Sequence, residues 1–227
     1  MTAPAGTSVP AGFVFGGGMS RFDLVIFDLD GTLVDSEGIA NRIFHKHLAA
    51  LGVPMTAEEV EAAFTGLSLP SCYGYIAEKH GILIDDAVFT PGLQAETFAC
   101  YRTELQPMPG VPAALAAIAQ PKCVASSSER AKIAYSLELT GLAPFFGDQI
   151  FSGREVPNPK PAPDVFLWAA DAMGVEPGRC AVVEDSRFGI AAGLAAGMTV
   201  FAYRAACELP DSVRRFDDMA LLPGFLS

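Results

Sequence analysis

Short apolar runs alternate with turn-forming and polar residues along most of the chain. The first run, residues 23–28 (DLVIFD), is rich in β-branched residues and ends in an acidic residue shortly before a glycine. This pattern is typical of a strand buried on both faces of a parallel sheet. Similar runs predict further strands over residues 122–125, 149–152, 180–184 and 198–202. Helical patterns separate them over residues 129–139, 162–173 and 187–196, so the sequence predicts right-handed βαβ units.

The segment between the first two predicted strands has a different pattern. Apolar residues recur there with the spacing of a helix face, at Ile39, Ile43, Phe44, Leu48 and Leu51. A second helix is predicted to begin at residues 56–59 (TAEE), which match a capping box. We expect the helices to be interrupted at Gly66, Pro70, Gly81 and Pro91-Gly92. No run in this segment has the pattern of a strand, which indicates a helical insert.

The expected architecture is therefore an α/β fold with an inserted cap. A Rossmann-like parallel sheet core takes residues 21–35 and 108–227, and an all-helical cap domain takes residues 36–107. Residues 1–20 are rich in Gly, Pro and Ala and lack the long apolar stretch of a signal peptide. We expect a disordered leader there, with the natural start at Met1 or Met19.

Charge and cysteine usage narrow the function classes. The formal net charge is -11, which disfavours nucleic acid and anionic membranes as partners. No apolar run reaches the length of about 18 residues that a membrane helix needs. The five cysteines are scattered and form no CxxC pair, which predicts a reduced, cytoplasmic protein.

Candidate chemistry follows the predicted strands, at the sheet edge where open α/β folds bind ligands. Asp28 and Asp30 leave the first strand together, and such carboxylates repel each other unless a cation or a shared proton compensates. Glu184 and Asp185 follow a later strand, where a helix cap would explain only one acidic residue.

Two further segments offer groups that bind an anion. Ser126 and Ser127 follow a strand and precede a predicted helix, whose N-terminus has free N–H groups; the alternative is an ordinary N-cap. Lys160 lies among three prolines, which either hold its ammonium rigidly or form a stiff solvent loop. Carboxylates, hydroxyls and a lysine in this order suit phosphoryl transfer with Mg²⁺ as cofactor, because the metal offsets the carboxylates and lets an anionic ester approach.

In these four segments the sequence resembles the haloacid dehalogenase superfamily, in the branch with a helical cap after the first strand. That branch includes β-phosphoglucomutase-like proteins and many sugar phosphatases. The resemblance implies that Asp28 attacks phosphorus, that Asp30 is the general acid and base, and that Ser126, Ser127 and Lys160 hold the phosphate. It also implies a metal site formed by Asp28, Asp30, Glu184 and Asp185, with Asp30 contributing its backbone carbonyl and Glu184 binding directly or through water.

The resemblance also narrows the reaction. Dehalogenases and phosphonatases of this superfamily lack a carboxylate at the position of Asp30. β-Phosphoglucomutases have a histidine where this chain has Ala40 and an arginine where it has Leu69. A phosphatase is therefore expected, with a mutase and a non-catalytic binding protein as alternatives.

Within the phosphatases the chain resembles bacterial 6-phosphogluconate phosphatases. The similar segments are residues 19–22, 79–81 and 151–153, whereas Asn158-Pro159 differs from the expected pattern. The expected substrate is a small phosphorylated sugar or sugar acid, with 6-phosphogluconate as one candidate. We expect a monomer or weak dimer, and cap hinges near residues 35–36 and 106–110.

Overall fold

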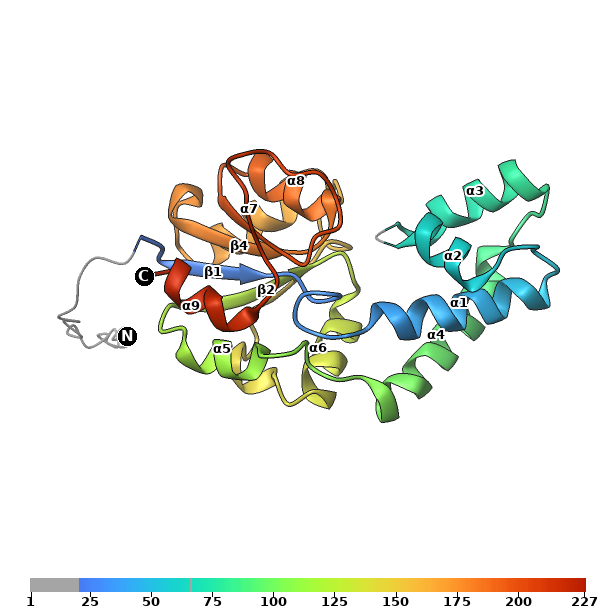
Figure 1. The fold of residues 1–227 in the computed structure, drawn as a ribbon, viewed down its shortest axis with the longest axis horizontal. Helices are drawn as coiled ribbons and strands as arrows, with labels where there is room; N and C mark the ends of the chain where they lie inside the picture. Colours follow the sequence, from blue (N-terminus) through green and yellow to red (C-terminus); the bar gives the residue numbers. More distant parts are fainter. Residues whose placement is uncertain (1–20, 66) are drawn as a thin grey trace, which may run out of the picture.

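The computed structural model describes residues 21–65 and 67–227, so the expected leader, residues 1–20, and Gly66 lie outside the described residues. A six-stranded sheet in the order β3-β2-β1-β4-β5-β6, with every strand parallel to its neighbours, forms the centre (Figure 1). The strands are β1 (Leu24–Phe27), β2 (Lys122–Ser126), β3 (Ile150–Ser152), β4 (Cys180–Glu184), β5 (Thr199–Tyr203) and β6 (Arg214–Phe216). The predicted α/β class with a Rossmann-like parallel sheet is confirmed.

Helices cover both faces of the sheet. Along β1, Leu24 and Ile26 point to the face covered by α7 (Asp164–Ala172) and α8 (Arg187–Ala195). Val25 and Phe27 point to the opposite face, which carries α5 (Val111–Ala117), α6 (Arg130–Leu139) and α9 (Leu222–Phe225) (Figure 1). These four β1 side chains are at most 1% exposed, and burying each contributes roughly 1.5–3 kcal/mol. Three 3₁₀ helices are also present in the described residues: Ala143–Phe145, Pro177–Arg179 and Met219–Leu221.

Among the described residues, four helices lie between β1 and α5 in the chain, and we call them the cap. They are α1 (Glu37–Ala50), α2 (Ala57–Phe64), α3 (Leu69–His80) and α4 (Asp86–Glu104). They lie to one side of the sheet, beyond the end where β1 terminates (Figure 1). The predicted capping box is formed, because Thr56 accepts from the backbone of Glu59 and donates its own N–H to the Glu59 carboxylate. The exact division of the chain into core and cap domains at residues 36 and 107 stays a prediction.

One expectation for the cap is wrong. Pro91-Gly92 does not interrupt a helix, because α4 runs through it from Asp86 to Glu104. Phe89 and Leu93, on either side of Pro91, both pack into the apolar cluster that extends from the core into the cap, and this packing holds the two parts of the helix in line. The lost backbone hydrogen bond of proline is local, whereas the packing extends along the helix.

The two connections between cap and core run side by side. Asp35 donates its backbone N–H to the carbonyl of Gln106, and Met108 donates to that of Leu33. Val34 and Pro107 form an antiparallel bridge between them. The expected hinges thus lie in one paired segment, although their motion stays a prediction. Within the described parts of the chain, we find no helix long and apolar enough to cross a membrane.

Candidate active site

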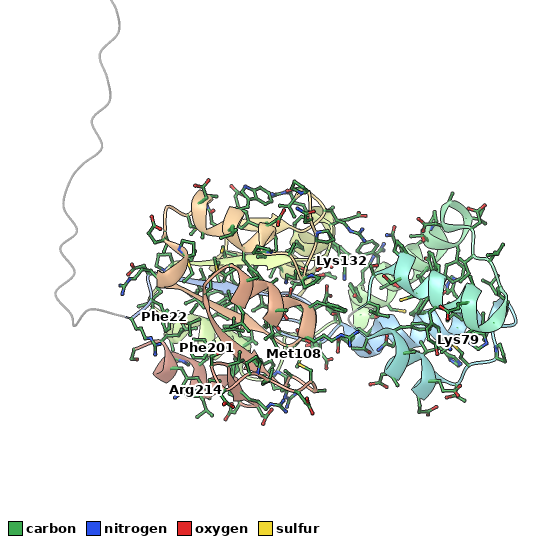
Figure 2. All side chains as sticks on the ribbon, turned by 90° about the horizontal axis from the view of Figure 1, so that it is seen from above. Phe22, Lys79, Met108, Lys132, Phe201 and Arg214 are labelled. Atoms are coloured by element: carbon green, nitrogen blue, oxygen red, sulfur yellow. The ribbon has the colours of Figure 1, made fainter. Side chains whose placement is uncertain are left out.

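A cavity of about 850 Å³ lies between the carboxyl ends of the strands and the cap. Figure 2 shows Lys132 on the core, at the side that faces the cap helices. All site residues expected from the sequence line this cavity: Asp28, Asp30, Ser126, Ser127, Lys160, Glu184 and Asp185. The structure therefore brings together side chains from segments that are far apart in the sequence.

Lys160 is the centre of one cluster of charges. Its Nζ donates to Asp28 Oδ1 at 2.6 Å, to Glu184 Oε1 at 2.7 Å and to the carbonyl of Ala125 at 3.0 Å. The Lys160 side chain is only 3% exposed. Burial would lower the pKa of this ammonium, but the charges of Asp28 and Glu184 outweigh it and raise the pKa above its ordinary value. Lys160 is thus a fixed cation beside Asp28.

Two carboxyl groups in this cluster lack full compensation. Burial raises the pKa of Asp28 from 3.8 to about 7, against the opposing charge of Lys160, and repulsion from Glu184 adds to the rise. Burial and the charges of Glu184 and Asp28 raise the pKa of Asp185 well above its ordinary value, although Thr32 donates to Asp185 Oδ1 at 3.0 Å. Both carboxylates would be stabilised by a further cation.

Gly31 allows the loop after β1 to approach Asp185. Its φ is +77°, a conformation that side chains rarely adopt, and a Cβ at this position would overlap the Asp185 carboxylate. Glycine is therefore required at position 31, both by the backbone conformation there and by the close approach of Asp185.

The donor set fits Mg²⁺. Hard carboxylate oxygens from β1 and β4 face one cavity, and two of these carboxyl groups repel each other at short range. In residues 21–65 and 67–227, no three Asp, Glu, His or Cys side chains already form a complete metal cage. A complete cage is not what Mg²⁺ needs, because it usually keeps several waters and binds through one or two carboxylates. The Asp30 side chain is not one of these carboxylates, because it belongs to a different cluster, around Lys132.

Lys132 is a site residue that the sequence interpretation missed. Its Nζ donates to Asp30 Oδ1 at 3.0 Å, to Asp30 Oδ2 at 2.9 Å and to the Ser128 hydroxyl at 3.0 Å. Ser36 and Ser128 also donate to Asp30, at 2.6 and 2.7 Å. Burial would raise the pKa of Asp30, but the charge of Lys132 and these hydrogen bonds together lower it. No pattern in the sequence indicated this role, because Lys132 lies within α6 (Arg130–Leu139), away from the residues that follow the strands.

The local alternatives considered for the other segments do not hold. The N-cap of α6 is Glu129, so Ser126 and Ser127 do not cap this helix. The N-cap of α8 is Ser186, so neither preceding carboxylate serves that purpose. The loop around Lys160 is not simply a solvent loop, because the lysine side chain is buried, and the following helix begins at Asp164 instead of residue 162.

The positions that matter for the mutase alternative also lie at the cavity. Ala40 on α1 and Leu69 on α3 are both part of its lining. Neither side chain has a hydrogen-bonding group, so neither can hold a sugar phosphate by polar contacts.

The family follows from this fold and site together with a comparison of the sequence. A family model of haloacid dehalogenase-like hydrolases matches residues 22–197. The chain belongs to the haloacid dehalogenase-like hydrolases. The predicted superfamily and an enzyme of the hydrolase class are therefore confirmed.

Known relatives of this haloacid dehalogenase-like hydrolase include phosphatases. The 6-phosphogluconate phosphatase of Escherichia coli (strain K12) is 35% identical over 187 residues, covering 82% of this chain and 85% of the relative. A fructose-1-phosphate phosphatase of the same organism is 30% identical over 179 residues, covering 78% and 94%. The crystal structure of a haloacid dehalogenase-like protein of unknown function from Agrobacterium tumefaciens matches with a TM-score of 0.78 and 31% identity, covering 90% and 97%.

Proposed function

We propose that this protein is a Mg²⁺-dependent phosphatase that hydrolyses the monoester of a small phosphorylated sugar or sugar acid through an aspartyl phosphate on Asp28. The observation that supports this most directly is the position of Asp28. Its carboxylate lies at the end of β1, is held by Lys160 and faces a cavity of about 850 Å³. The similarity to two sugar phosphate phosphatases supports the substrate class, and 6-phosphogluconate is one candidate.

Lys160 and the serines after β2 would hold the phosphoryl group. Lys160 is a buried cation, and Ser126 and Ser127 line the same cavity. Hydrogen-bond donors that are fixed before the reaction stabilise the charge that builds up on the phosphoryl oxygens, at no cost of reorganisation. The rigid, proline-rich segment around Lys160 serves this purpose.

The reaction then takes two steps. A carboxylate oxygen of Asp28 attacks phosphorus, the bond from phosphorus to the ester oxygen breaks, and Asp30 gives its proton to the leaving oxygen. In the second step Asp30 takes a proton from water, whose oxygen attacks phosphorus and releases inorganic phosphate from Asp28. Both Asp28 and Asp30 return to their starting states.

Mg²⁺ would be held by Asp28, Asp185, the backbone carbonyl of Asp30 and, directly or through water, Glu184. When bound it offsets the negative charge of these carboxylates and lets an anionic ester approach Asp28. The raised pKa of Asp28 and Asp185 is what uncompensated carboxylates at such a site would show.

A β-phosphoglucomutase-type reaction is less well supported. It requires groups that keep the sugar phosphate in the site while it is reoriented, and Ala40 and Leu69 cannot provide them. Water is then the final acceptor. A pure binding protein would have no use for a buried lysine beside one carboxylate and an acid next to it. The cytoplasmic location fits the five free thiols of the chain, and we keep a monomer or weak dimer as the expected state.

The central test is phosphate release from a panel of phosphorylated sugars and sugar acids, with Mg²⁺ and with a chelator. We expect release only with Mg²⁺, and Asp28→Asn should lower kcat/KM by roughly 10⁴-fold or more. The matched control is Asp23→Asn, which changes an exposed carboxylate at the other end of the same strand. Full activity of Asp28→Asn, or release that is independent of Mg²⁺, would overturn the proposal.

A further inference from the structure

The two walls of the active-site cavity differ in charge. The core wall provides three cationic side chains, Lys132, Arg154 and Lys160, together with five acidic ones, Asp28, Asp30, Glu129, Glu184 and Asp185. The cap wall provides uncharged groups that form hydrogen bonds: Asn41, Thr65, Ser68, Ser71, Gln94 and Thr97. The cap wall also provides apolar side chains, among them Phe44, Phe64 and Phe98.

No cation belongs to the cap wall within the described residues. Its one charged side chain is Glu37, at the first turn of α1. Burial and the negative charges of Asp30 and Glu61 raise the pKa of this carboxyl group above its ordinary value. A second anionic group on a substrate would therefore meet apolar and neutral surface together with an acidic residue.

The direction of the substrate follows from where its phosphate would bind. The phosphate sits at the core wall, beside Lys160 and Ser126, so the remainder of the ester must extend across the cavity toward the cap. Sugar hydroxyls can pair there with amide and hydroxyl groups, which both donate and accept. A carboxylate or second phosphate would find no cationic partner there, so an ion pair would not replace the hydration that it loses on binding.

We infer that the enzyme takes monophosphates of neutral sugars or polyols and discriminates against sugar acid phosphates and bisphosphates. This inference rests on the proposed phosphatase function. It separates the chain from its 6-phosphogluconate phosphatase relative, because the substrate of that relative has a carboxylate at the end opposite its phosphate. In this inference the cap wall sets the choice of substrate.

Arg154 is the group that would support the opposite result. It lies on the core in the loop after β3, its side chain is exposed, and its backbone N–H donates to Ser152 Oγ at 3.1 Å. A guanidinium there could pair with a substrate carboxylate. It is close along the chain to Gly153, which packs on Ser126, and so belongs to the phosphate end of the cavity. This position favours contact with the phosphate end over contact with a distal group.

The test compares two open-chain substrates that differ only at one carbon. Sorbitol 6-phosphate ends in a hydroxymethyl group where 6-phosphogluconate has a carboxylate. With Mg²⁺ present, kcat/KM should be at least about tenfold higher for sorbitol 6-phosphate, and fructose 1-phosphate should similarly exceed fructose 1,6-bisphosphate. Equal or faster turnover of 6-phosphogluconate would overturn the inference while leaving the phosphatase intact. Failure to hydrolyse any of these esters, and para-nitrophenyl phosphate as well, would overturn the phosphatase itself.

A positive charge added to the cap wall tests whether the lack of cations there causes the substrate preference. Gln94 lies on α4, is exposed and lines the cavity, so Gln94→Lys should raise kcat/KM for 6-phosphogluconate relative to sorbitol 6-phosphate by at least about fivefold. Ala95→Lys adds the same charge at the next residue, outside the lining, and should leave the ratio unchanged. An unchanged ratio in Gln94→Lys would contradict the role of the cap wall. A selective loss of 6-phosphogluconate turnover in Arg154→Gln would contradict it as well.

Discussion

At the scale of single residues, the site keeps its two key carboxyl groups in opposite electrostatic states. Asp28 has a raised pKa of about 7, whereas the pKa of Asp30 is lowered. The difference comes from their partners. Asp28 shares Lys160 with a second carboxylate, Glu184, while Asp30 alone receives Lys132 and two serine hydroxyls. This order is the reverse of what the reaction needs, because Asp28 must be ionised to attack and Asp30 must be protonated to act as an acid. A cation bound beside Asp28 would lower the pKa of Asp28.

Lys132 should therefore control the protonation of Asp30. Replacing it in Lys132→Met removes the positive charge but keeps much of the side-chain volume, so the pKa of Asp30 should rise. As a general acid, Asp30 must be protonated when the ester bond breaks, and the alkaline limb of the kcat/KM profile should then move to higher pH. We expect kcat/KM near neutral pH to fall by about tenfold because Asp30 also loses its positioning contacts.

The controls separate charge from structure. Lys132→Arg keeps the positive charge and should leave the alkaline limb in place. The shift should also be absent with para-nitrophenyl phosphate, whose leaving group needs no proton. An alkaline limb that stays fixed in Lys132→Met with a sugar phosphate would show that Lys132 does not tune Asp30.

Three of the motif residues could be predicted from the sequence because each stands at the end of an apolar run. Asp28, Ser126 and Glu184 are placed at the sheet edge by the strands themselves. Lys132 could not be found in this way, because it lies within a helix and a lysine there is ordinarily a solvated residue. Only the packing of α6 beside the loop of Asp30 turns it toward the cavity.

At the scale of elements, the first turn of α8 is packed directly on the site. A Cβ at Gly189 would overlap the carboxylate of Glu184, which also accepts from the backbone and hydroxyl of Ser186. Gly189 itself donates its N–H to Ser186 Oγ at 3.0 Å. The glycine thus lets the helix begin against the acidic pair and keeps Glu184 within reach of Lys160.

Gly189→Ala should impair catalysis more than folding. The added methyl group would displace Glu184, which breaks its contact with Lys160 and shifts the cation away from Asp28. We expect kcat/KM to fall by about 10²-fold, since misplacement by about 1 Å can cost that much. Circular dichroism should show that the variant remains folded.

A second glycine provides the control. Gly74 lies within α3, and a Cβ at this position would meet no atom within 4 Å. Gly74→Ala should raise the free energy of unfolding by roughly 0.5–1 kcal/mol and leave kcat/KM unchanged. Wild-type activity in Gly189→Ala would show that Glu184 tolerates displacement and that the packing of α8 does not set the site.

The elements that could be predicted from the sequence are those with a strong pattern of apolar residues. The central strands are apolar on both faces and were predicted to within one or two residues. Strand β6 was missed, because Arg214 and Arg215 are exposed and only Phe216 is buried, which leaves no apolar run. Helix α5 has only 7 residues and begins at Val111-Pro112. Its start therefore has the pattern of a turn, and the helix was not predicted.

At the scale of the whole molecule, the long helical insert places a second wall over the sheet edge. The sequence predicted this insert from its change of period. It could not predict which cap residues line the cavity, because that depends on how α1, α3 and α4 are oriented on the paired connections at Val34 and Pro107. The neutral character of the cap wall became apparent only from this arrangement.

The stability of the whole protein should depend on pH because of the carboxylate cluster. The pKa of Asp28 is raised from 3.8 to about 7, and that of Asp185 is also raised, so the folded state binds protons that the unfolded state releases. Their contribution to stability is fully present below about pH 4 and is lost as pH rises through about 7. We expect the Tm of the metal-free protein to fall over this range.

Mg²⁺ should restore it, with a larger rise at about pH 8 than at about pH 5, because the ligands must be deprotonated. Differential scanning calorimetry with chelator and with Mg²⁺ measures both effects, and Asp185→Asn should flatten the pH dependence by removing one of the repelling charges. A metal-free Tm that rises steadily between pH 4 and 7, or a Mg²⁺ effect that is equal at both pH values, would mean that these carboxylates do not form the metal site.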